Sequence, residues 1–142
     1  MAQKIIQTSI EIDAGPERVW EILTDFTRYP DWNPFLLSVT GPLREGETLA
    51  INAGGMQFRP EIIRLRPGRE LVWKGKLLFR GLFDGRHSFK LEALDNDRTL
   101  FRHEEQFSGL LVGLFARKLE TDTRAGFEAM NQKLKELAEG SF

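Results

Sequence analysis

The stretch from Ser108 to Gly140 places the strongest constraint on the fold of this chain. Apolar residues recur there at steps of three or four, which is the spacing of one buried face of a long amphipathic helix. Ser108 is suited to begin this helix and Gly140 to end it. Gly113 is an alternative start, in which case residues 109–113 are less regular and precede the helix. Gly126 lowers the helix propensity inside the helix. The apolar face comprises Leu111, Phe115, Leu119, Phe127, Met130, Leu134 and Leu137.

The composition indicates a single soluble domain. A chain of 142 residues is of ordinary single-domain size and can bury a core without disulfides. It contains no cysteine, which excludes a disulfide framework and a thiolate metal site. No segment has the pattern of a signal peptide or the ~20 apolar residues of a membrane span. Its formal net charge of −1, with both signs interspersed, argues against nucleic-acid binding. We therefore expect a cytoplasmic protein that is a monomer or a weak homodimer.

Most of the chain before this helix has the pattern of β-strands. The β-branched run at 4–12 predicts a strand, and the Gly-Pro pair that follows signals a helix at about 16–25. A short helical turn is expected at 28–32, where an Asn-Pro pair ends it. Further strands, joined by short turns, are predicted at 35–40, 48–53, 57–65, 70–79, 86–94 and 98–107.

Two details refine this antiparallel arrangement. Pro60 lies inside a predicted strand and implies a bulge or an edge there, while the Pro-Gly pair at 67–68 predicts a type II turn. In the last three strands apolar and charged residues alternate, so one face of the sheet is apolar and the other faces solvent. We expect the long helix to cover the apolar face of one curved sheet, which gives an α+β domain spanning 1–142.

Three segments carry a family resemblance, namely AGPERVW at 14–20, RYPDWNPF at 28–35 and EQFSGLL at 105–111. With the order of elements, they resemble the START-like (SRPBCC, helix-grip) superfamily, and most of all its polyketide cyclase/dehydrase-like branch. The resemblance implies a seven-stranded curved sheet around the C-terminal helix, with two short helices after the first strand and an apolar cavity between sheet and helix. This superfamily includes lipid and hormone carriers, aromatase/cyclases and co-chaperone domains, so the fold does not choose the activity.

Three polar residues share the predicted inner face with phenylalanine, leucine and tryptophan: His87, His103 and Glu105. Three interpretations are open, because buried polar groups need partners. They satisfy one another or water, they contact a ligand, or they act as acid–base catalysts with shifted pKa values. Their spacing matches no metal motif, and we expect neither a metal nor a cofactor. Because side chains alternate between the two faces of a strand, Glu105 is expected to face inward and Glu104 to face solvent. We therefore predict that Glu105→Gln alters ligand affinity or turnover while Glu104→Gln does little.

We expect this chain to bind an apolar or aromatic small molecule, lipid- or polyketide-like, in the cavity. The alternative is a cyclase- or dehydratase-type enzyme acting on a polyketide-like substrate, and a third interpretation is a structural or co-chaperone-like module with a closed cavity. Trp32 either fills the core or lies at the cavity mouth, and the loop at 79–83 either folds over the core or acts as a gate. The predicted ligand-binding residues are Trp32, Phe35, Trp73, His87, Phe89, Phe101, His103, Glu105, Phe115, Leu119 and Phe127.

Overall fold

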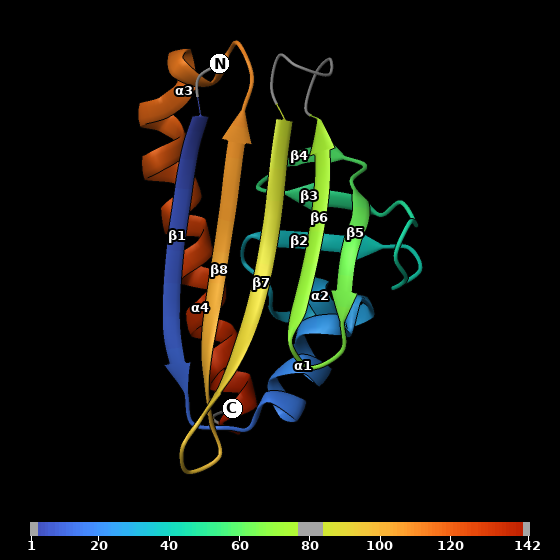
Figure 1. Cartoon of the computed structure of the whole chain (residues 1–142), viewed down its shortest axis with the longest axis vertical. Helices are drawn as coiled ribbons and strands as arrows, with labels where there is room; N and C mark the ends of the chain where they lie inside the picture. Colours follow the sequence, from blue (N-terminus) through green and yellow to red (C-terminus); the bar gives the residue numbers. More distant parts are fainter. Residues whose placement is uncertain (1–2, 77–83, 141–142) are drawn as a thin grey trace.

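The protein consists of an antiparallel sheet, a smaller sheet that runs across it, and a long C-terminal helix (Figure 1). The computed structural model describes residues 3–76 and 84–140. The first strand, β1 (Gln3–Ile12), is followed by the helices α1 (Pro16–Thr24), η1 (Phe26–Arg28) and α2 (Tyr29–Trp32), near their predicted places. The other strands are β2 (Leu36–Thr40), β3 (Ala50–Ala53), β4 (Met56–Phe58), β5 (Glu61–Arg66), β6 (Glu70–Lys76), β7 (Asp84–Leu94) and β8 (Arg98–Ser108).

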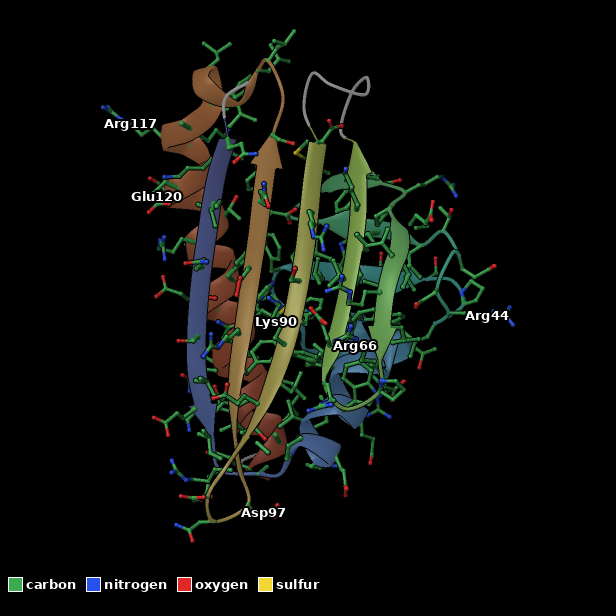
Figure 2. All side chains as sticks on the ribbon, viewed as in Figure 1. Arg44, Arg66, Lys90, Asp97, Arg117 and Glu120 are labelled. Atoms are coloured by element: carbon green, nitrogen blue, oxygen red, sulfur yellow. The ribbon has the colours of Figure 1, made fainter. Side chains whose placement is uncertain are left out.

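The larger sheet has the order β1-β8-β7-β6-β5, and all of its neighbours are antiparallel. The two hairpin turns at 66–69 and 95–97, both within the described residues, have the predicted chemistry. Gly68 has φ +76° and the amide of Arg69 donates to the carbonyl of Arg66, while Asn96 has φ 62° in the tight turn between β7 and β8. Charged side chains such as Lys90 lie on the outer face (Figure 2). The inner face is therefore left for apolar residues, as the alternation predicts.

Pro60 divides what the sequence suggests is one strand at 57–65. β4 pairs with β3 and β5 pairs with β6, and the strand is interrupted between them because a proline has no N–H to donate. Residues 3–76 and 84–140 consequently contain eight strands, and β2-β3-β4 form a separate hydrogen-bonded sheet. A bridge between Thr48 and Glu61 joins the two sheets, and the amide of Leu49 donates to the carbonyl of Pro60 at 2.9 Å. The small sheet lies behind β5 and β6 and runs across them (Figure 1).

The C-terminal helix is continuous but not uniform. It comprises α3 (Val112–Lys118), a π-helical turn η2 (Leu119–Thr123) and α4 (Arg124–Ala138). Ser108 is not its N-cap, because Ser108 still pairs with β1 and β7 at the end of β8. The helix instead begins next to Gly113, the alternative start, and Gly140 follows its end with φ +79°.

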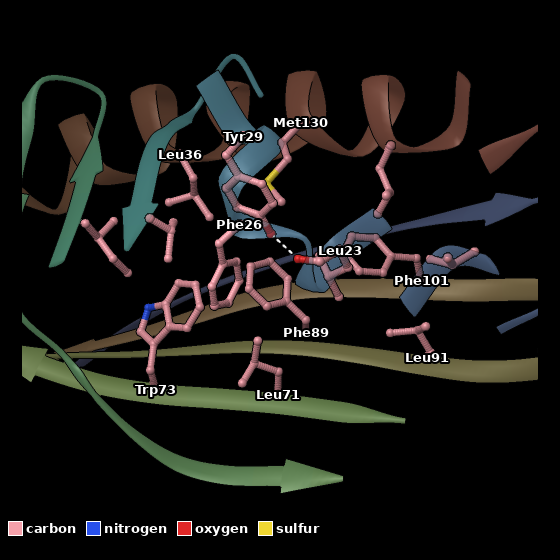
Figure 3. Close-up of a cluster of buried hydrophobic side chains, with 14 of the residues drawn as sticks. Leu23, Phe26, Tyr29, Leu36, Leu71, Trp73, Phe89, Leu91, Phe101 and Met130 are labelled. Atoms are coloured by element: carbon pink, nitrogen blue, oxygen red, sulfur yellow. Dashed lines mark hydrogen bonds between the residues drawn. The ribbon is translucent and has the colours of Figure 1, made fainter. Parts of the chain in front are cut away.

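The core lies between the larger sheet, the short helices and α4 (Figure 3). Leu23, Phe89 and Met130 are fully buried there and come from a short helix, a strand and the long helix. Tyr29, the single tyrosine, is also buried, and its hydroxyl donates to the carbonyl of Leu23. Burial, and then the charge of Asp25, raise the pKa of Tyr29, so this hydroxyl has a structural place in the core.

One expectation falls on residues that the structure does not describe. The loop at 79–83, predicted to cover the core or act as a gate, lies outside the described residues. Among the helices of the described part, none is both long and apolar enough to cross a bilayer.

Candidate functional site: a buried polar chain

A single line of hydrogen bonds crosses the interior from β8 to β1. It joins Glu105, His87, His103, Asn131 and Thr8, and we call these five residues the polar chain. Glu105 Oε1 lies 2.6 Å from His87 Nδ1, and His87 Nε2 lies 2.8 Å from His103 Nε2. His103 Nδ1 lies 2.9 Å from Asn131 Oδ1, and Asn131 Nδ2 donates to Thr8 Oγ1 at 2.9 Å. All three members of the predicted polar trio are therefore brought together.

Strand register and helix position create this contact. His87 is directly opposite Glu105 in the β7–β8 ladder, so their side chains share the inner face. His103 is two residues before Glu105 on β8 and therefore points to the same side. Asn131 comes from α4, in which Phe127, Met130 and Leu134 are also buried.

The polar chain is buried in its middle and partly exposed at its two ends, Thr8 and Glu105. His103 is fully buried and His87 is 3% exposed, whereas the side chain of Glu105 is 12% exposed. Burial lowers the pKa of His87 from 6.5 to about 3 and raises that of Glu105 from 4.5 to about 8. Burial, followed by the neighbouring His87, also holds the pKa of His103 well below its ordinary value. At neutral pH all three groups are uncharged, and Glu105 is the group nearest to solvent.

Aromatic rings surround the two histidines. The ring of Phe127 stacks on His103 with centroids 3.8 Å apart, and Trp73 stacks on His87 at 5.1 Å. Phe89 lies 4.7 Å from both imidazoles. These contacts exclude water from the histidines, which is the physical cause of their lowered pKa values.

Trp73 adds an unusual feature to this face. It is 1% exposed, and its indole Nε1–H has no acceptor among the described residues. Because buried donors are nearly always paired, an unpaired indole N–H calls for an acceptor that the described side chains do not supply. Asn33 Nδ2 is a second buried donor without an acceptor in the described part of the chain.

Most of the remaining predicted residues lie on the inner side. Phe101 is fully buried, and Leu119 is half-buried against Phe127. Trp32 is half-buried with its ring 5.3 Å from that of Tyr29, so it packs on the core. Phe35 is half-buried and packs edge-on against Phe127 at 5.3 Å.

Phe115 differs from the other predicted residues. This side chain is 40% exposed on α3 and does not lie on the inner face. The helix before the π-helical turn lies against the edge strand β1 (Figure 1), so α3 has one strand to cover and buries only Val112 fully. Steps of four residues also drift around an α-helix, and this drift accumulates between Phe127 and Phe115.

Sequence reasoning missed two members of the polar chain, Asn131 and Thr8. Asn131 follows Phe127 by four residues and precedes Leu134 by three, so helical spacing places it on the buried face. Thr8 alternates with Ile6 and Ile10 in β1 and so shares their face. A polar residue at an apolar position of each pattern was the available signal.

Two surface grooves formed by described residues lie away from the polar chain. One, of about 430 Å³, is on the small sheet around Asn52, and the other, of about 880 Å³, lies between the start of α1 and the β5–β6 turn. Neither includes a predicted site residue. Where the cavity is expected, the aromatic rings of Phe35, Phe127 and Trp73 are in contact with their neighbours. Within the described residues no group of carboxylates and histidines is arranged to hold a metal ion.

Comparison with known protein families places this geometry in context. Residues 3–139 match the family described as polyketide cyclase/dehydrase and lipid transport. The chain belongs to this family. Its fold, a helix gripped by an antiparallel sheet, is that of START-like proteins. No curated protein sequence matches the chain.

Solved structures of this polyketide cyclase/dehydrase-like fold agree with the assignment. A START superfamily protein from Mycobacterium smegmatis is 19% identical, with a TM-score of 0.70 over 94% of this chain and 98% of that one. Truncated norcoclaurine synthase from Thalictrum flavum is 14% identical, with a TM-score of 0.73 over 96% and 93%. The di-domain ARO/CYC StfQ of the steffimycin biosynthetic pathway is 13% identical, with a TM-score of 0.77 over 97% of this chain and 52% of that one. At these identities the likeness concerns the fold.

Proposed function

We propose that this protein binds an uncharged, largely apolar or aromatic small molecule on the inner face of the larger sheet, beside the polar chain. The observation that carries the proposal is the indole N–H of Trp73, which has no acceptor among the described residues and lies next to His87 on a face that is otherwise aromatic. A ligand oxygen that accepts from Trp73 Nε1 satisfies this donor, and the rings supply apolar contact area. The family's description, lipid transport and polyketide cyclisation or dehydration, concerns molecules of this kind.

Binding at this face requires a rearrangement of rings. Phe35 is half-buried and packs against both apolar clusters of the interior, the larger one around Phe89 and the smaller one formed by Ile6, Phe107, Val112 and Phe127. Its displacement therefore opens a path toward Phe127 and His103. Phe127 is fully buried and holds the opposite side of this path. The ligand therefore competes with the contact between these two rings, and we expect binding to quench or shift the emission of Trp73.

The first experiment is native mass spectrometry of freshly purified protein, followed by titration with the uncharged fluorescent probe N-phenyl-1-naphthylamine. Trp73→Phe removes the indole N–H and keeps an aromatic ring, while Trp20→Phe on α1 is the matched control because Trp20 is half-buried outside the polar chain. We expect a co-purified ligand or saturable probe binding. We also expect any ligand with an acceptor oxygen to bind at least several-fold more weakly to Trp73→Phe than to Trp20→Phe. Absence of saturable binding by both methods contradicts the proposal.

The alternative is an enzyme of cyclase or dehydratase type. It is favoured by one observation, the partly exposed neutral carboxylic acid of Glu105 hydrogen-bonded to His87, because such a pair can give and take a proton. The two functions separate on Glu105→Gln. As an enzyme, this variant binds a polyketide-like substrate with little change but loses turnover by ~10²–10⁴-fold, the usual contribution of a general acid or base. As a carrier, the parent protein returns the substrate unchanged.

A further inference from the structure

The direction of each hydrogen bond in the polar chain follows from the hydroxyl of Thr8 at one end. Thr8 Oγ1 donates its single proton to the carbonyl of His103 at 2.9 Å, so toward Asn131 it acts only as an acceptor. The amide of Asn131 must therefore present its NH₂ to Thr8 and its oxygen to His103. In this way a hydroxyl on β1 fixes the orientation of an amide on α4.

The fixed amide sets the protons on both histidines. Asn131 Oδ1 accepts, so His103 Nδ1 carries a hydrogen and the uncharged ring has a lone pair at Nε2. His87 Nε2 lies 2.8 Å away and must donate to that lone pair. His87 then has its own lone pair at Nδ1, facing Glu105 at 2.6 Å. The remaining proton belongs to the bond between Glu105 and His87.

Burial decides where this last proton lies. An ion pair of His87 and Glu105 places two charges among Trp73, Phe89 and Phe127, whereas the neutral pair places none. Within the described residues, the hydrogen bonds of this pair bring no further charged side chain to it: His87 bonds to Glu105 and His103, and Gly85 is the residue against Glu105 Oε2. A Cβ at Gly85 would lie 2.7 Å from Glu105 Oε2, so a larger residue there would require the carboxyl group to shift.

We propose that Asn131, held by Thr8, is a positioning residue that fixes the order of protons along the polar chain and so keeps Glu105 as a neutral acid. If Glu105 loses its proton, His87 must carry its hydrogen at Nδ1 to donate to the carboxylate. Nε2 of His87 then has a lone pair that faces the lone pair on Nε2 of His103. This repulsion is relieved only if His103 also changes tautomer. That change requires the amide of Asn131 to flip, and Thr8 opposes the flip. The site therefore favours uncharged ligands over cationic ones, a consequence that rests on the proposed binding function.

The test compares Thr8→Val with Thr8→Ser. Both keep a small side chain, but only serine keeps the hydroxyl that orients Asn131. The readout is the infrared C=O band of a protonated carboxylic acid, assigned to Glu105 by its loss in Glu105→Gln and its retention in Glu104→Gln. We expect the band at pH 7 in the parent, a midpoint for its loss that is lower by about one pH unit or more in Thr8→Val, and a parent-like midpoint in Thr8→Ser. Nitrogen NMR of the two imidazoles should report the same change of tautomer.

Each result decides a separate claim. A missing acid band at pH 7 overturns the neutral state of Glu105, and equal midpoints in Thr8→Val and the parent overturn the positioning role of Asn131. Neither readout uses a ligand, so both are independent of the proposed function.

Naphthalene-1-methanol and 1-naphthylmethylamine, an alcohol and an amine of similar size, then test the ligand class. We expect the alcohol to bind the parent at least ~10-fold more tightly at pH 7, since a buried cation needs a countercharge; equal affinities overturn this preference.

Discussion

At the scale of single residues, Phe127 has the most direct influence on the candidate site. It is fully buried, stacks on His103 and meets the edge of Phe35. It therefore keeps water from the histidine pair and also supports the apolar cluster around Val112. Phe115, twelve residues earlier on the same helix, is 40% exposed and provides a matched comparison.

We expect Phe127→Ala to lower the free energy of unfolding by about 3–5 kcal/mol, because a ring is removed from a site that is packed on several sides. Phe115→Ala should cost less than about 1 kcal/mol, as for most substitutions at an exposed position. Chemical denaturation of both variants measures these values. A loss under about 1 kcal/mol in Phe127→Ala would show that Phe127 is not a core residue.

At the scale of elements, the fit between α4 and the segment before β2 depends on a glycine. A Cβ on Gly126 would lie 2.3 Å from Cδ1 of Phe35, which no ordinary contact allows. The sequence presents Gly126 only as a weak helix former, but in the structure its missing side chain admits the Phe35 ring. Helix propensity and packing therefore make opposite predictions for Gly126→Ala.

We expect packing to prevail, so that Gly126→Ala destabilises the protein by about 1 kcal/mol or more through the displaced ring. In a Phe35→Ala background the obstacle is gone, and the same change should stabilise by about 1 kcal/mol through helix propensity. The reversal of sign, measured by thermal or denaturant unfolding, is the test. A gain in stability in both backgrounds would mean that Phe35 does not occupy this place in solution.

At the scale of the whole molecule, the polar chain makes stability depend on pH. Glu105 keeps its proton in the folded state up to about pH 8, whereas the unfolded chain releases it near 4.5, so stability falls as pH rises between these values. His87 has the opposite effect, since its pKa of about 3 in the fold makes stability rise up to pH 6.5. His103 acts in the same direction as His87.

Between pH 6.5 and 8 the effect of Glu105 is the largest among these three groups, because the unfolded histidines lose only their last half proton each in this interval. We expect the free energy of unfolding to fall by about 1 kcal/mol across it, since the loss through Glu105, at up to about 1.36 kcal/mol per pH unit, is partly offset by the two histidines. Glu105→Gln should remove this fall, and Glu104→Gln should retain it. Denaturation curves at a series of pH values measure the slope. A parent protein whose stability is flat from pH 6.5 to 8 would contradict the raised pKa.

The sequence alone determined the parts of this protein that depend on local periodicity. Period-two alternation placed His87, His103 and Glu105 on one face of the larger sheet, and the turn residues around Gly68 and Asn96 set its hairpins. The family resemblance supplied the helix-grip arrangement, which the comparisons confirm.

Only the tertiary structure decided how distant segments meet. The link from His103 to Asn131 joins β8 to α4, and the link from Asn131 to Thr8 returns to β1, so no local pattern contains it. The same holds for Gly126 against Phe35, and for Phe115, whose helical turn lies at the edge strand rather than over the sheet. Periodicity reports which side of an element is apolar, whereas the direction of a hydrogen bond or the space for a ring depends on atoms that the fold brings from elsewhere in the chain.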